Sequence, residues 1–171
     1  MKGMTKNRRK RRGQRGNAAV ETVLVIVPLM MVLLGIIDFA VAIFVMDTVE
    51  FAARQGVRYA VTGNTANDNV TSAPLKQDAS IRQVVRDNSL GFLKGSPDSQ
   101  ITIDYYYLDT TSNTWKSTAS NANGNLVKIG ISGFSWAWMV PGWRGMSSLS
   151  INAASADISG ACVNGICPPR T

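Results

Sequence analysis

Apolar residues form one long run near the N-terminus and only short, periodic patterns after it. Residues 22–37 are sixteen positions without a charge, and a further eight, residues 39–46, follow Asp38. About 20 helical residues are enough to cross a hydrocarbon core about 30 Å thick. The pattern therefore predicts a single transmembrane span over about residues 20–46.

Helical character continues beyond this span. Residues 47–62 alternate apolar and charged positions without a proline, as on a two-faced helix, until Gly63 and Asn64 end the pattern. A helix over residues 17–62 has 46 residues and a length of about 69 Å at 1.5 Å per residue. Because a bilayer covers less than half of that length, the outer half must pack on an exported domain or on a neighbouring subunit.

Residues 63–171 have the patterns of one small α+β domain. Hydrophobic spacing predicts a second helix over residues 75–93. An apolar, aromatic stretch, residues 134–146, is broken at Pro141 and Gly142. Two-residue alternation predicts a roughly three-stranded antiparallel sheet, packed on helix, with strands at residues 101–108, 126–132 and 148–158.

Charge separates the first residues from the rest of the chain. Residues 1–16 contain eight Lys and Arg and no acid, whereas ten basic and eleven acidic residues are spread over the remainder. A basic run directly before an apolar span is the positive-inside signal. It predicts a single-pass protein of the inner membrane, with residues 1–16 in the cytoplasm and residues 63–171 in the periplasm. No basic patch interleaved with aromatic residues follows residue 16, which argues against a nucleic-acid partner.

Two carboxylates inside the apolar run are candidate functional groups. An ionised side chain costs about 2.5–3.5 kcal/mol at the bilayer centre on insertion scales, so Glu21 either has a specific partner or reaches the headgroups. Asp38 could lie at the outer headgroups, face another helix or mark where the helix leaves lipid, and the headgroup position is favoured. Pro28 and Gly35 are tolerated in membrane helices, where they kink the axis or allow a neighbour to approach closely.

Candidate chemistry elsewhere in the chain is sparse. The chain has no histidine, no Gly-rich phosphate loop and no paired-carboxylate motif, so we expect no catalytic residue, no metal ligand and no cofactor. Cys162 and Cys167 would most simply form one short disulfide in an oxidising compartment, since a redox pair is more typically spaced as Cys-x-x-Cys. Trp136 and Trp138 would share one face of an extended segment, as in core or subunit packing.

Several stretches resemble a known family. They are RGNAAVETVLVIVPLM at the start of the span, LGIIDFAVAIF in its second half, AARQGVRYA at the end of the long helix and, more weakly, SLSINAAS near the C-terminus. With these stretches the sequence resembles the TadE-like family, minor pilins or pseudopilins of the tight-adherence (Flp-type) branch of type IV pilus systems. Type IV pilins often begin the mature chain with an aromatic residue, and Asn17 departs from that pattern.

The resemblance implies processing and assembly. A prepilin peptidase of the inner membrane would cut after Gly16, making Asn17 the new N-terminus and Glu21 the fifth mature residue. Glu21 would then set register by meeting the α-amino group of a neighbouring subunit. The implied partners are membrane lipid, the peptidase, other pilins or pseudopilins and the pilus assembly platform.

Two functions remain open at this point. The first is a cleaved pseudopilin that inserts its helix into a pilus or its initiating complex and carries a small exported domain. The alternative is a single-span membrane protein that is never cut and serves as a periplasmic binding or scaffold module. The sequence does not fit a conventional secretory signal, because its apolar region is too long and the lone Gly16 precedes that region.

Overall fold

The computed structural model of the chain describes residues 12–69, 71–139, 145, 148–160, 162 and 166–170, with side chains from residue 18 onward. The predicted leader therefore falls largely outside the described residues, as do Pro141 and Gly142. The elements are α1 (Arg12–Thr62), α2 (Gln77–Asp87), a 3-10 turn η2 (Asp98–Gln100), β1 (Ile101–Asp109), β2 (Thr114–Thr118), β3 (Leu126–Trp136) and β4 (Leu149–Ile158).

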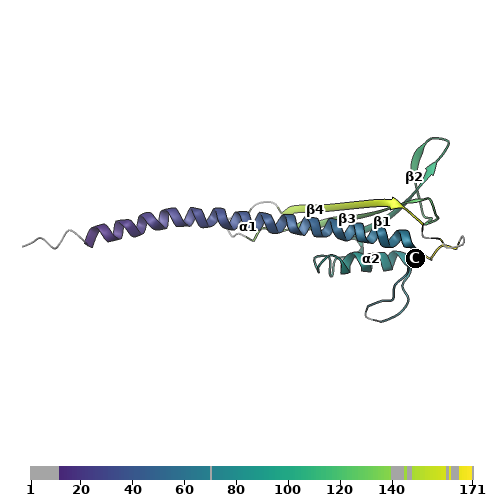
Figure 1. The fold of residues 1–171 in the computed structure, drawn as a ribbon, viewed down its shortest axis with the longest axis horizontal. Coiled ribbons are helices and arrows are strands. Elements are labelled where there is room, and N and C mark those ends of the chain that lie inside the picture. The colour runs from purple at the N-terminus through teal and green to yellow at the C-terminus, as the bar shows by residue number, and fades with distance from the viewer. Residues whose placement is uncertain are drawn as a thin grey trace, which may run out of the picture.

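The molecule is a long helix with an α+β domain packed along one end of it. In Figure 1 β1, β3, β4 and α2 lie alongside the C-terminal half of α1 and β2 projects away near its end, whereas the N-terminal half of α1 extends away alone. We call the part of the structure after α1 the head. The fold class expected from the sequence, a long apolar helix followed by a second helix and an antiparallel sheet, is confirmed.

The sheet has four antiparallel strands in the order β2-β1-β3-β4, one more than predicted. The missed strand, β2, pairs only with the second half of β1, with Tyr105 opposite Thr118 and Asp109 opposite Thr114. Most of its side chains are exposed, so its sequence, TWKST, has no buried face to reveal by alternation. The hairpin turn before it uses Asn113, whose φ of 51° is a left-handed conformation that asparagine tolerates.

The core lies where one face of the sheet meets α1 and α2. The alternation that predicted the strands is reproduced in the burial of β1, where Ile101, Ile103 and Tyr105 point inward. Ile81 and Val85 of α2 fill the same core. The other buried apolar residues of this cluster on the strands and on α1 include Val127, Ile129, Ile131, Ile151, Val45, Val49, Ala52, Ala53, Val57 and Ala60.

The second helix is shorter than the predicted range of residues 75–93. It ends at Asp87, because Asn88 and Ser89 turn their side chains back onto backbone carbonyls of the helix: Asn88 Nδ2 donates to Val84 O at 2.8 Å, and Ser89 Oγ donates to Arg86 O at 2.6 Å. Such bonds compete with continued helix. The chain then turns, although Leu93 still reaches the core.

Candidate functional site: the long helix and its grip on the head

The inner half of α1, residues 18–34, is not buried by any described residue of the head. Every residue in it is exposed, and its large aliphatic side chains point in all directions around the axis. Among the described residues, α1 is the single helix long and apolar enough to cross a membrane. A helix that is apolar all round belongs in lipid or in a bundle of helices rather than in water. The chain therefore carries one N-terminal membrane anchor.

The candidate cleavage and register residues lie at the start of this inner half. Gly16 and Asn17 belong to the helical backbone of α1. Glu21 is exposed on the helix, one turn after Asn17, with an axial rise of about 6 Å between them. The neighbouring Thr22 donates from Oγ1 to Ala18 O at 2.8 Å. Pro28 is exposed within the helix and, having no N–H, leaves the carbonyl of residue 24 without its usual intrahelical donor.

Asp38 and Gly35 mark where the head begins to cover the helix. Asp38 is only 1 % exposed, and its Oδ2 accepts the backbone N–H of Met139 at 3.0 Å. Gly35 is also buried, and Trp138 lines a hollow together with Gly35 and Phe39. The sequence favoured a headgroup-exposed carboxylate at position 38. In the structure Met139 of the segment after β3 covers that carboxylate, and its depth in a membrane stays a prediction.

The AARQGVRYA stretch contains the surface of α1 that packs against the head. Its small residues Ala52, Ala53 and Gly56 are buried, whereas Arg54 and Arg58 of the same stretch are exposed. A Cβ added at Gly56 would lie 2.4 Å from Val85 Cγ2 of α2 and 3.0 Å from Ile129 Cδ1 of β3. The glycine thus lets one helix approach both a second helix and the sheet, which gives this part of the stretch a packing role.

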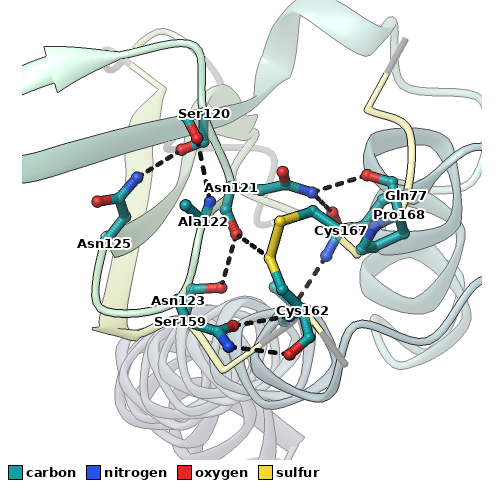
Figure 2. The surroundings of a disulfide bond; sticks show 11 residues. Gln77, Ser120, Asn121, Ala122, Asn123, Asn125, Ser159, Cys162, Cys167 and Pro168 are labelled. Carbon is teal, nitrogen blue, oxygen red and sulfur yellow. Dashed lines mark hydrogen bonds between the residues drawn. A yellow bond between two sulfur atoms is a disulfide. The ribbon is translucent and has the colours of Figure 1, made fainter. Parts of the chain in front are cut away.

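Cys162 and Cys167 form the predicted disulfide. Asn123, in the turn before β3, holds the peptide of Cys162 from both sides: its Nδ2 donates to Cys162 O at 2.9 Å, and its Oδ1 accepts from Cys162 N at 2.7 Å. Figure 2 shows the neighbouring Asn121 reaching across the bridge, where its Nδ2 donates to Pro168 O at 2.9 Å. These hydrogen bonds join the C-terminal segment, at Cys162 and Pro168, to the loop between β2 and β3.

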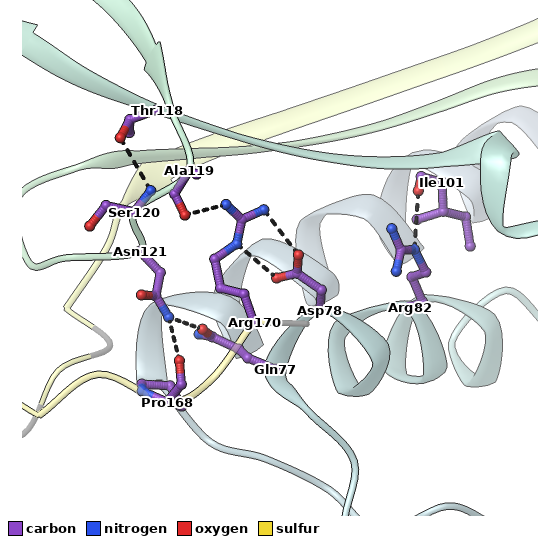
Figure 3. Close-up of polar contacts among 10 residues, drawn as sticks. All are labelled: Gln77, Asp78, Arg82, Ile101, Thr118, Ala119, Ser120, Asn121, Pro168 and Arg170. Atoms are coloured by element: carbon purple, nitrogen blue, oxygen red, sulfur yellow. Dashed lines mark hydrogen bonds and ion pairs between the residues drawn. The ribbon is translucent and has the colours of Figure 1, made fainter.

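The C-terminal segment is held further by an ion pair with α2. Arg170 donates to both carboxylate oxygens of Asp78, from Nε to Oδ1 at 3.3 Å and from Nη2 to Oδ2 at 3.0 Å (Figure 3). Asp78 is 4 % exposed. The guanidinium also lies 4.2 Å from the centre of the Tyr105 ring. Burial, reinforced by the negative charge of Asp78, raises the pKa of Tyr105 to about 12. Sequence reasoning missed this cluster, because Asp78 and Arg170 lie 92 residues apart with no shared motif.

The comparison with known families agrees with the arrangement of α1. Residues 16–58 match the model of the family described as TadE-like protein. The long helix is TadE-like. This match confirms the resemblance drawn from the sequence, and it covers the membrane anchor together with most of the AARQGVRYA stretch that packs against the head. The TadE-like family is associated with the tight-adherence pilus. No curated protein and no solved structure matches the chain.

In the part of the chain that the structure describes, no three His, Cys, Asp or Glu side chains gather to hold an ion. The distinctive features of the molecule are the exposed apolar inner half of α1, the carboxylates on that helix and the packing of the head against its outer half.

Proposed function

We propose that the protein is a minor pilin or pseudopilin of a tight-adherence pilus, cleaved by a prepilin peptidase between Gly16 and Asn17. The observation that most directly supports this proposal is the exposed inner half of α1, whose apolar side chains need lipid or other helices around them. In this proposal the protein acts by assembling with other pilins or pseudopilins on the assembly platform, and not by catalysis. The head stays in the periplasm until assembly carries it outward.

Cleavage changes what holds the helix in the membrane. Residues 1–16 carry eight positive charges, which resist transfer across the bilayer. Once they are removed, the inner half keeps its apolar surface but loses its cytoplasmic anchor. The helix can then leave lipid for a bundle of similar helices, exchanging lipid contacts for side-chain packing. The head need not unfold in this transfer, because among the described residues its core includes only residues of the outer half of α1.

Cleavage also creates a partner for Glu21. The new α-amino group at Asn17 is a positive charge one helical turn from the carboxylate. When helices stack with an axial offset, the carboxylate of one subunit can meet the amine of the next. Removing one member of a buried ion pair costs about 3–5 kcal/mol, so a register that leaves Glu21 unpaired inside a bundle is disfavoured.

The cleavage step is tested by the mass of the mature protein. Expression with the peptidase should yield a chain that lacks residues 1–16 and begins at Asn17, as read by intact-mass analysis and N-terminal sequencing. Gly16→Ala should block or sharply slow the cut, because a Cβ would enter a tight peptidase site. Gly13→Ala changes another glycine of the same leader and should be processed normally.

The same measurement decides against the proposal if it is wrong. A full-length chain recovered from native membranes would mean that the protein is an uncleaved single-span anchor with a periplasmic binding or scaffold domain. Equal processing of Gly16→Ala and Gly13→Ala would place the cut elsewhere.

A further inference from the structure

The three residues that follow β3 lie against α1 near the start of its outer half. We call residues 137–139 the clasp. Its Trp138 lines a hollow whose other walls are Val32, Gly35, Ile36 and Phe39 of α1. Met139 is fixed through its backbone, which donates to Asp38, while its side chain is 51 % exposed. The clasp thus brings two large apolar side chains from the head beside the apolar span.

The depth of the clasp follows from the length of uncovered helix. Residues 18–34 are uncovered, and 17 residues of helix span about 25 Å. A hydrocarbon core is about 30 Å thick and takes about 20 helical residues to cross. A span of about 20 residues that starts at residue 18 therefore ends near residue 37, short of the outer limit at residue 46 that the apolar pattern predicts. The clasp, which covers Gly35 and Asp38, lies at that outer boundary.

The side chains around the clasp suit this boundary. Ile36, Ile37 and Phe39 of α1 are 62 %, 56 % and 57 % exposed, so an apolar surface continues from the span past the clasp. Tryptophan is enriched at membrane–water interfaces, where its apolar ring and polar N–H are both accommodated. An aspartate at this depth needs a donor from protein, and the backbone N–H of Met139 supplies one.

We propose that the clasp is a second membrane contact, with Trp138 and Met139 immersed in the outer interface of the lipid bilayer. Asp38 acts as its holding group, since the carboxylate fixes the clasp against the helix while the clasp shields the carboxylate from lipid. The occupant of the surface is lipid because the surface is continuous with the span. The inference rests on the helix crossing a membrane and does not depend on cleavage at Gly16.

Depth-dependent fluorescence quenching tests the contact on the uncleaved full-length chain. One variant keeps Trp138 as its single tryptophan, and a matched control keeps Trp115, which lies on β2 far from the clasp (Figure 1); the other tryptophans become Phe. Each is reconstituted into phosphatidylcholine vesicles containing lipids brominated near the headgroup or deep in the chains, with no peptidase present. Shallow bromines should remove most of the Trp138 emission, and deep bromines less. Trp115 should respond only to acrylamide added to the water.

Two outcomes would overturn the lipid contact. If acrylamide quenches Trp138 as strongly as Trp115 and bromolipids do not, the clasp lies in water. If neither quencher affects Trp138, protein covers it, as a second copy of the chain would. In both cases cleavage at Gly16 remains separately testable by mass.

Substitution of Asp38 tests the holding group. Asp38→Asn keeps an oxygen that can accept the Met139 N–H, whereas Asp38→Leu removes the acceptor and fits the apolar surroundings. In the single-Trp138 background we expect Asp38→Asn to keep the quenching pattern, and Asp38→Leu to lose the preference for shallow bromines. An unchanged pattern in Asp38→Leu would show that Asp38 does not hold the clasp.

Discussion

The two halves of α1 belong to one continuous helix but are built for different surroundings. Residues 18–34 place large aliphatic side chains all round the axis and leave every one exposed. Residues 35–62 bury one face against the head, with small residues such as Ala53 and Gly56 on it, and from residue 47 onward their exposed face carries charged residues such as Arg54. The inner half requires apolar surroundings, which either lipid or other helices can provide, whereas the outer half requires one particular partner, the head.

This difference separates folding from assembly. The core that holds the head together includes the outer half of α1 and stops short of the inner half. The inner half can therefore pass from lipid into a bundle without disturbing the core, provided that the grip of the head holds. Substitutions in the outer half should change the stability of the head, and substitutions in the inner half should change assembly alone.

The largest effect on the head is expected from Gly56→Leu. Its side chain must enter the space held by Val85 and Ile129, and overpacking of this kind costs about 3 kcal/mol. Urea unfolding of detergent-solubilised protein, followed by tryptophan fluorescence, should show a lower midpoint. Gly145→Leu is the control, because no heavy atom of the described residues lies within 4 Å of a Cβ added there. Equal midpoints for the two variants would mean that α1 does not need this close approach.

Loss of the disulfide should have a somewhat smaller effect. Replacing Cys162 and Cys167 by serine opens a loop whose closure is worth about 2 kcal/mol in the chain-entropy model. The unfolding midpoint of the head should fall, and dithiothreitol should lower that of the native chain to a similar value. Thiol labelling of denatured, unreduced protein from its own compartment should find neither cysteine reactive. Stoichiometric labelling of both would contradict the bridge.

Alkaline pH should weaken the head through Tyr105. Burial raises the pKa of Tyr105 to about 12, with the charge of Asp78 as a second cause, so the folded head favours the neutral phenol. The stability that this preference contributes is complete below the ordinary tyrosine pKa of about 10 and is lost as the pH rises through 12. Phenolate absorbance of folded Tyr105→Phe should lack the last transition seen in the native chain. A native titration that is already complete near pH 10 would refute the assignment.

Local patterns in the sequence were sufficient for some elements and silent about others. Ile101, Ile103 and Tyr105 alternate because β1 has one buried face, and that local signal predicted the strand. The edge strand β2 has no buried face and so gave no signal. The disulfide could be predicted from the cysteine spacing and from the predicted export of residues 63–171. By contrast, the bond between Asp38 and Met139 joins residues 101 apart, and such a contact is set by tertiary packing and not by any local pattern.

The smallest effect on the head is expected from Glu21→Gln, which should change assembly alone. Glu21 is exposed on the inner half, away from the core, so the urea midpoint of the head should equal that of the native chain. Leader removal should also persist, while the neutral amide can no longer form an ion pair with the α-amino group of a neighbouring subunit. We therefore expect less protein in sheared fibres or in crosslinked pilin complexes, and the same from Glu21→Val.

Glu50→Gln is the matched control: its carboxylate pairs with Arg54 on the exposed face of the outer half, and exposed helix pairs contribute only about 0.3–0.5 kcal/mol. If Glu21→Gln is cleaved and incorporated as well as Glu50→Gln, the carboxylate of Glu21 does not set the register. A lowered urea midpoint in Glu21→Gln would instead show that the two halves of α1 are energetically coupled.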